Sequence, residues 1–204
     1  MLYPLSYGGR PGRPGLGNSS KLRRARSPPY PVAVRTLRRL ATLLVWLLLT
    51  GCVAQAPPAP AVLRDTPPPW PAPRDGVSYF EAAGVASSRL DDTTDQRVFT
   101  LTLAIDGEPV PLVPGIGLDL PRALQAPVHT HDETGVVWLE GRGAREVTLG
   151  QFFTIWGVRF SRDCLGAACG TLTVTADGRP VSDPAGLRLS EVQDLLAVAV
   201  VASG

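Results

Sequence analysis

The chain has 204 residues, and its 20 Lys and Arg against 18 Asp and Glu give a formal net charge of +2. The charge is uneven: residues 1–51 hold nine of the basic residues and no acid, so residues 52–204 carry 11 Arg against 18 acids, a net charge of −7. An acidic region of about 150 residues excludes nucleic acid as the expected partner, since phosphate recognition needs clustered cations, and it is long enough for one domain with a hydrophobic core.

The N-terminal part predicts an export signal. Residues 1–31 are rich in Gly, Pro, Ser and Arg, a composition that predicts a disordered basic leader. Two interpretations stay open, that this leader is translated, and that translation starts at Val32 or Val34. Residues 32–51 have the order of a lipoprotein signal peptide, with three arginines followed by an apolar run over 40–49. That run is shorter than the about 20 residues of a membrane-spanning helix.

The signal ends on a cysteine in the order Leu49-Thr50-Gly51-Cys52. This order resembles the bacterial lipobox, in which small residues admit the processing protease and the cysteine thiol receives the lipid. The resemblance implies that Cys52 is the site of lipid attachment, with palmitate among the acyl chains. We therefore expect a protein anchored in the cell membrane or outer membrane, facing the extracytoplasmic side.

Residues 52–75 are predicted to form a proline-rich tether, because eight prolines lie between Val53 and Arg74 and favour extended polyproline II structure. With Cys52 acylated, two cysteines remain, Cys164 and Cys169. Outside the cytosol such a pair is expected to oxidise, which predicts a structural disulfide. The alternative, a redox-active pair, lacks the two-residue spacing of thioredoxin motifs.

Residues 76–204 are predicted to form a single β-rich domain. Apolar residues alternate with Thr and Ala over 99–105, which predicts a half-buried strand, and Asp106-Gly107 predicts a hairpin turn. Residues 100–110 match residues 171–181 at seven of eleven positions. Two copies are too few for a repeat array. We nevertheless expect two equivalent hairpins, one in each half of the domain.

One short helix is predicted between the hairpins, since Leu149, Phe152, Phe153 and Trp156 fall on one helical face and should plug the core. Thr148 with Gln151 predicts a capping box, and Gly157 predicts the end of the helix. Residues 136–140 read as a strand, and the aliphatic run 195–201 reads as a central strand buried on both faces. The expected class is α+β, a mixed sheet with one short packed helix, β-grasp-like, with a small β-sandwich as the alternative.

Both histidines of the chain lie in His129-Thr130-His131. In an extended segment residues i and i+2 share one face, so two imidazoles could bind one copper or zinc ion, with Asp132 or Glu133 adding an oxygen. A closed zinc site takes four ligands and a catalytic one three, so distant residues such as Glu140 or Asp119 would have to contribute. The competing interpretation is that the histidines hydrogen-bond the loop and orient Trp138.

The runs 129–140 and 147–157 together resemble a family of uncharacterised bacterial and archaeal envelope proteins. The resemblance covers roughly Val98 to the C-terminus and implies an anchored envelope protein rather than a particular activity. No nucleophile–base pair or phosphate-binding loop stands out, so we expect no enzyme. The expected function is an extracytoplasmic binding or structural domain for an envelope protein or small ligand, with metal binding as the alternative.

Overall fold

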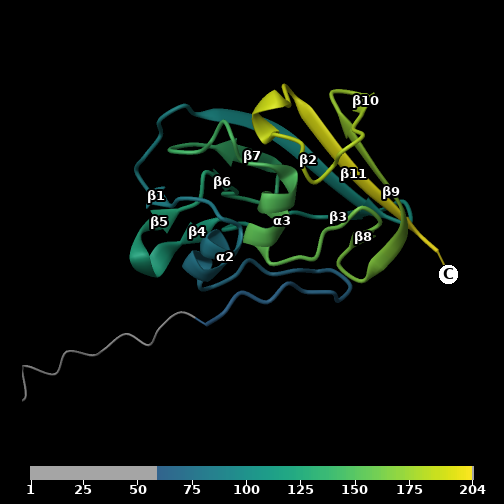
Figure 1. Ribbon diagram of the computed structural model, residues 1–204, viewed down its shortest axis with the longest axis horizontal. Helices are drawn as coiled ribbons and strands as arrows, with labels where there is room; N and C mark the ends of the chain where they lie inside the picture. The colour runs from purple at the N-terminus through teal and green to yellow at the C-terminus, as the bar shows by residue number, and fades with distance from the viewer. Residues whose placement is uncertain (1–58, 204) are drawn as a thin grey trace, which may run out of the picture. The chain divides into compact units, whose positions relative to one another are not determined.

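The computed structural model describes residues 59–203 (Figure 1). The expectations for the leader, the signal peptide and Cys52 lie outside these residues. Within the described part of the chain, no helix has both the length and the apolar character needed to cross a membrane.

Two sheets make up the β structure of residues 59–203. The larger contains, in spatial order, β10 (Arg179–Pro180), β9 (Ala168–Ala176), β11 (Leu195–Ala202), β2 (Arg97–Ile105), β7 (Val136–Leu139) and β6 (Val128–His129), with β3 (Glu108–Val110) paired to β2 and β8 (Cys164–Leu165) to β9. The smaller contains β1 (Ser88–Arg89), β5 (Leu124–Gln125) and β4 (Leu118–Asp119). The helices are α2 (Gly76–Ala82) and α3 (Leu149–Trp156), with 3-10 turns η1 (Leu120–Arg122) and η2 (Leu189–Glu191).

The repeated sequence explains the centre of the larger sheet. β11 pairs in parallel with β2 on one side and antiparallel with β9 on the other. Val198 of β11 faces Leu103 on β2 and Val174 on β9, and these two residues occupy the same position of the repeat. The prediction of two equivalent hairpins is confirmed, since β2–β3 and β9–β10 both pair across an Asp-Gly turn.

The two turns hold opposite ends of β11. Asp106 and Asp177 both have φ of 52°, the left-handed conformation that such a turn requires. The Asp106 carboxylate accepts a hydrogen bond from the Ala202 amide at 2.8 Å. The Asp177 carboxylate accepts three, from the amides of Gln193, Asp194 and Leu195. Each aspartate thereby fixes a turn and one end of the central strand.

The predicted helix is confirmed as α3. The Thr148 hydroxyl accepts from the Gln151 amide while the Gln151 side chain accepts from the Thr148 amide, and Gly157 ends the helix with φ of 73°. Leu149, Phe152, Phe153 and Trp156 are all buried. They belong to the same core cluster as the inward residues of β2, β7, β9 and β11, and α3 lies against that side of the sheet (Figure 1).

The α+β class and the mixed sheet are confirmed, with two differences. A second helix, α2, forms over residues 76–82, and it buries Phe80. Strand β11 is central but is not buried on both faces: Leu196, Val198 and Val200 are buried, whereas Ala197 and Ala199 between them are only half-buried. Small aliphatic side chains such as these can remain partly exposed to solvent. An uninterrupted apolar run therefore does not require that other elements cover both faces of the strand.

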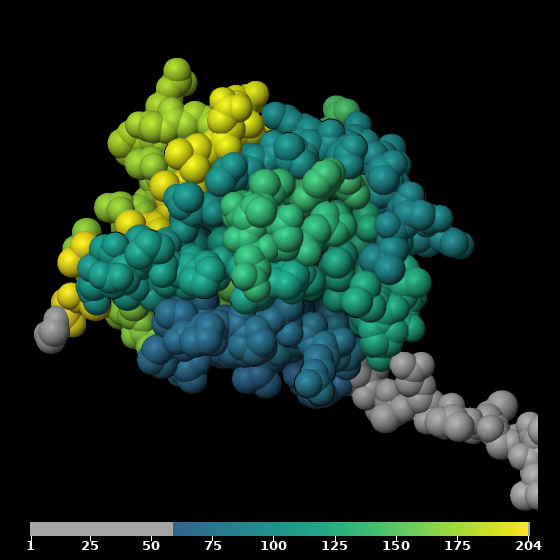
Figure 2. All heavy atoms as spheres, turned by 180° about the vertical axis from the view of Figure 1, so that it is seen from behind, coloured from purple at the N-terminus to yellow at the C-terminus, as the bar shows by residue number. Residues whose placement is uncertain are grey.

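The described part of the predicted tether, residues 59–75, is not free. This segment, called the strap below, packs on the domain and runs along the edge where α2 lies (Figures 1 and 2). Arg64 forms a parallel bridge with Val158, and its amide donates to the Gly157 carbonyl at 2.9 Å. Trp70 is 1% exposed, and its carbonyl accepts from the Trp156 indole at 3.0 Å. Extended proline-rich backbone has no internal hydrogen bonds, and here its unpaired groups bond to the domain instead.

Candidate functional site

The histidine pair lies where β6 ends. His129 pairs with Trp138 across β6 and β7, and the following Thr130 ties the segment to the loop before β4. Gly117 of that loop has φ of 75°, and a Cβ there would come within 2.2 Å of the Val128 carbonyl. The glycine-interrupted loop over 114–118 is therefore required for the close approach that covers His129.

His129 is fully buried, and one of its ring nitrogens lacks a partner. Nδ1 lies 3.4 Å from the Ala126 carbonyl, a long contact. Nε2 has no hydrogen-bond partner and faces Oε2 of the buried Glu140 at 3.6 Å. The other carboxylate oxygen of Glu140 accepts from the Gln96 side-chain amide. Three polar side chains thus form a chain that runs from the buried His129 through the buried Glu140 to Gln96 at the surface.

Burial sets the charge of this histidine. Loss of solvent around the ring, together with the nearby His131, lowers the pKa of His129 from 6.5 to about 4, against the opposing effect of Glu140. His129 is therefore neutral at pH 7. A neutral ring that gives its Nδ1 proton toward Ala126 presents an unprotonated Nε2 to the carboxylate.

His131 and Asp132 are exposed and have other partners. The His131 ring stands edge-on to His129 at 4.9 Å and to Trp138 at 5.2 Å between centroids. The Asp132 carboxylate accepts from the Thr134 hydroxyl and amide, and these bonds lower the pKa of Asp132. The structure does not gather His129, His131 and Asp132 around one point. No group of three or more His, Cys, Asp or Glu that could hold a metal ion occurs in residues 59–203.

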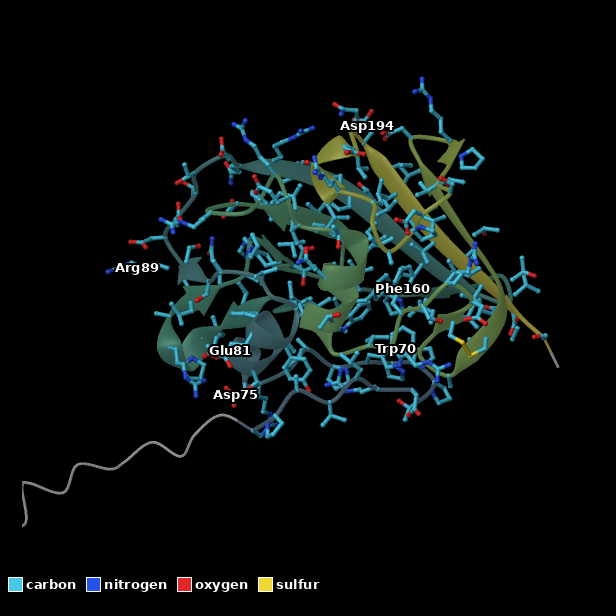
Figure 3. The ribbon with its side chains drawn as sticks, viewed as in Figure 1. Trp70, Asp75, Glu81, Arg89, Phe160 and Asp194 are labelled. Atoms are coloured by element: carbon cyan, nitrogen blue, oxygen red, sulfur yellow. A yellow bond between two sulfur atoms is a disulfide. The ribbon has the colours of Figure 1, made fainter. Side chains whose placement is uncertain are left out.

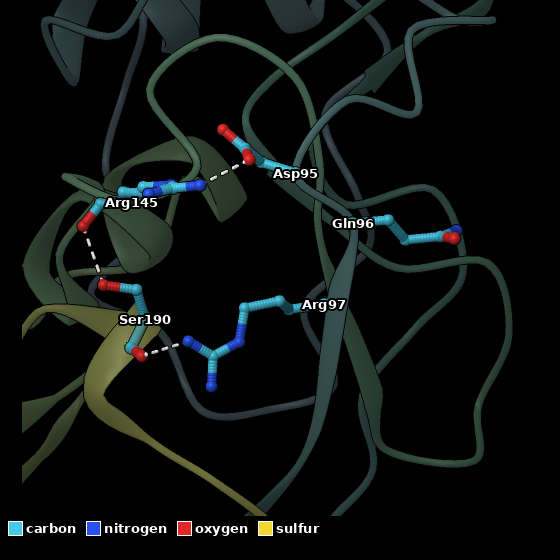
Figure 4. A pocket seen from close by; sticks show the side chains of 5 residues that line it. All are labelled: Asp95, Gln96, Arg97, Arg145 and Ser190. Atoms are coloured by element: carbon cyan, nitrogen blue, oxygen red, sulfur yellow. Dashed lines mark hydrogen bonds and ion pairs between the residues drawn. The ribbon is translucent and has the colours of Figure 1, made fainter.

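A surface pocket of about 440 Å³ lies on the other side of Gln96 (Figure 4). Its charged groups are already paired, Arg145 with Asp95 at 2.6 Å and Arg97 with the Ser190 carbonyl at 2.8 Å. Ser190 also donates to the Arg145 carbonyl at 2.7 Å. Sequence reasoning missed this pocket because its residues come from three distant segments, and no spacing in the sequence links them.

Cys164 and Cys169 form the predicted disulfide, with Cα atoms 4.1 Å apart. They face each other across β8 and β9. The Arg159 guanidinium lies 2.7 Å from the Cys169 sulfur, and the Ser161 amide donates to the Cys164 carbonyl. This disulfide closes the small hairpin of β8 and β9. The hairpin lies beside the strap, since the Ala167 amide donates to the Thr66 carbonyl.

The larger sheet has an outer face that residues 59–203 do not cover. Side chains alternate along each strand, so this face carries the residues that lie between the buried ones. It is called the outer face below, and its members carry no charge: Val98, Thr100, Thr102 and Ala104 of β2, Val136 and Trp138 of β7, Thr171, Thr173 and Thr175 of β9, and Leu195, Ala197, Ala199 and Val201 of β11.

The centre of the outer face carries small side chains. Ala197 on β11 lies between Thr102 and Thr175, and Ala199 lies between Ala104 and Thr173. At one end of this face Trp138, with His131 against its ring, adjoins the 47% exposed Val98. The face is thus uncharged, with small side chains at its centre and Trp138 and His131 at one end.

No family model, curated protein or solved structure matches this chain. The resemblance to envelope proteins therefore stays a prediction.

Proposed function

We propose that this protein is a lipid-anchored extracytoplasmic binding domain, without enzymatic activity of its own, that contacts another envelope protein through the outer face. The observation that carries the proposal is the absence of any charge on this face within a region whose net charge is −7. The cores of protein interfaces are depleted of charged residues, because burying an unpaired charge is costly.

The compartment is supported by two features of the chain. The order of residues 32–52 is that of a lipoprotein signal, and the disulfide between Cys164 and Cys169 is stable where the surroundings are oxidising. The partner is a protein because the outer face is a sheet surface with exposed Leu195 and Val201, and sheet faces pack on one another about 10 Å apart.

Site-specific photo-crosslinking in the source cell tests this proposal. A photoreactive side chain at Thr173 should give one adduct of defined mass, and the same group at the exposed Ser182 should not. Adding Ala197→Lys places a charge in the centre of the outer face and should remove the adduct, while the circular dichroism spectrum stays unchanged. An adduct that survives Ala197→Lys, or retention of the protein by purified cell-wall glycan, would contradict the proposed protein partner.

A second candidate function is binding of one copper or zinc ion by His129 and Glu140. It is favoured by the unpartnered Nε2 of His129, which lies 3.6 Å from a carboxylate oxygen of Glu140. Titration with Cu²⁺ and Zn²⁺ tests it. Affinity should be lost in His129→Ala and Glu140→Gln and kept in Asp132→Asn, whose carboxylate serves its own turn; equal affinity in all variants would refute it.

A further inference from the structure

We infer that the strap holds the domain close to the membrane and turns the edge that carries the strap toward the lipid surface. This inference rests on the proposed lipid anchor at Cys52. The partner of this edge is the bilayer that holds the protein's own acyl chains.

Only a short length of chain separates the proposed lipid at Cys52 from the docked strap. Seven peptide units join Cys52 to Ala59, and each spans at most about 3.6 Å, so the two lie no more than about 25 Å apart. If residues 53–75 were all free, the largest possible distance between Cys52 and Gly76 would be about 80 Å. Because residues 59–75 are docked, most of this possible separation between the lipid and the domain is lost.

The strap begins next to the N-terminus of α2. The Ala59 amide donates to the Asp75 carboxylate at 3.1 Å, and Asp75 pairs with Arg122 of η1 at 2.7 Å. Arg122 also pairs with the buried Asp119, whose carboxylate accepts hydrogen bonds from the Arg122 amide and from the Val77 amide in the first turn of α2. The segment that leads back to Cys52 therefore leaves the domain beside α2 and η1.

The edge that carries the strap exposes aliphatic side chains. Of the six large hydrophobic side chains that are exposed in residues 59–203, three lie in the strap or in η1: Val62 at 68%, Leu63 at 43% and Leu120 at 69%. The exposed charges of the strap, Asp65 and Arg74, cancel. A strap without net charge and with exposed aliphatic side chains suits the boundary between lipid head groups and acyl chains.

Energy transfer to the membrane tests the orientation. The full-length precursor is processed in a bacterial host, and the lipidated protein is added to vesicles that contain an acceptor-labelled lipid. Donor dyes are attached singly at Glu81→Cys, beside the strap, and at Asp194→Cys, on the opposite edge (Figure 3). We expect transfer from position 81 to exceed transfer from position 194 about twofold or more, given a reach of about 25 Å.

A longer linker is the matched control. Twenty Gly and Ser residues inserted between Gln55 and Ala56 leave every described contact intact and should bring the ratio toward one. Equal transfer from the two positions with an acylated Cys52, or a ratio that the insertion does not change, overturns this inference alone. Mass spectrometry that shows no acyl group on Cys52 overturns the lipid anchor and the inference together.

Discussion

Acid should destabilise this domain through His129. The ring is neutral in the folded protein because its pKa is about 4, whereas in the unfolded chain the value returns to 6.5. Between these values the unfolded state binds the additional proton, so the free energy of unfolding falls as the pH drops. The stabilisation is complete above pH 6.5 and is lost as the pH approaches 4.

The magnitude follows from the pKa difference. Since one pKa unit corresponds to about 1.4 kcal/mol, the full loss below the folded pKa is about 3 kcal/mol, and the loss at pH 5 is about 2 kcal/mol. Carboxylates with lowered pKa values, such as Asp132 and Asp177, start from 3.8 and act only at lower pH. The window between pH 5 and 7 therefore isolates the histidine.

Urea unfolding of residues 59–203, followed by fluorescence at a series of pH values, measures this effect. The wild type should lose about 2 kcal/mol from pH 7.5 to pH 5, and His129→Gln should lose much less. His131→Gln is the matched control, because that ring is exposed, and it should keep most of the dependence. Equal pH dependence in the wild type and His129→Gln would refute the reasoning.

Two further predictions concern the strap and the central strand. Trp70→Ala should cost about 3–5 kcal/mol and open the strap to proteolysis, since the ring is 1% exposed and packs edge-on to Trp156 at 5.6 Å. The exposed Leu63→Ala should change stability by less than about 0.5 kcal/mol, and equal effects would contradict a docked strap. Asp177→Ala should lower the urea midpoint at pH 7 more than Asp106→Ala, because Asp177 accepts three amide hydrogen bonds at the end of β11 and Asp106 accepts one. These bonds lower the pKa of Asp177, so the stability that its carboxylate adds to the folded protein is present above pH 3.8 and is lost as the pH falls through the pKa of the folded state. Identical urea midpoints in the two variants would contradict the larger role of Asp177.

The elements that the sequence predicted well are those whose signals are local. Helix α3 is specified by Thr148, Gln151 and Gly157 together with four apolar residues on one face, all within ten positions. The two hairpins follow from Asp-Gly turns after alternating strands. In these segments propensity, capping and hydrophobic pattern agree, and tertiary packing only confirms them.

The strap and the site were not predictable in this way. Proline-rich composition favours an extended chain but does not state whether that chain is solvated or docked. The single aromatic side chain in the segment, Trp70, was the only local sign, and its partner Trp156 lies 86 residues away. Likewise Gln96, His129 and Glu140 meet only because β2, β7 and β6 are neighbours in the sheet, and the order of strands depends on contacts distant in sequence.

The position of β11 has a consequence for the order of assembly. Strands β2 and β9 do not pair with each other; each pairs with β11, whose residues 195–202 follow every other strand in the chain. Until those residues emerge from the ribosome, the β9–β10 hairpin is not paired with β2, β7 or β6, and one edge of β2 lacks its partner strand. Pairing between β2 and β11 closes a loop of about 95 residues, and contacts of such separation form slowly. The larger sheet is therefore completed only when residues 195–202 are available to pair with both β2 and β9.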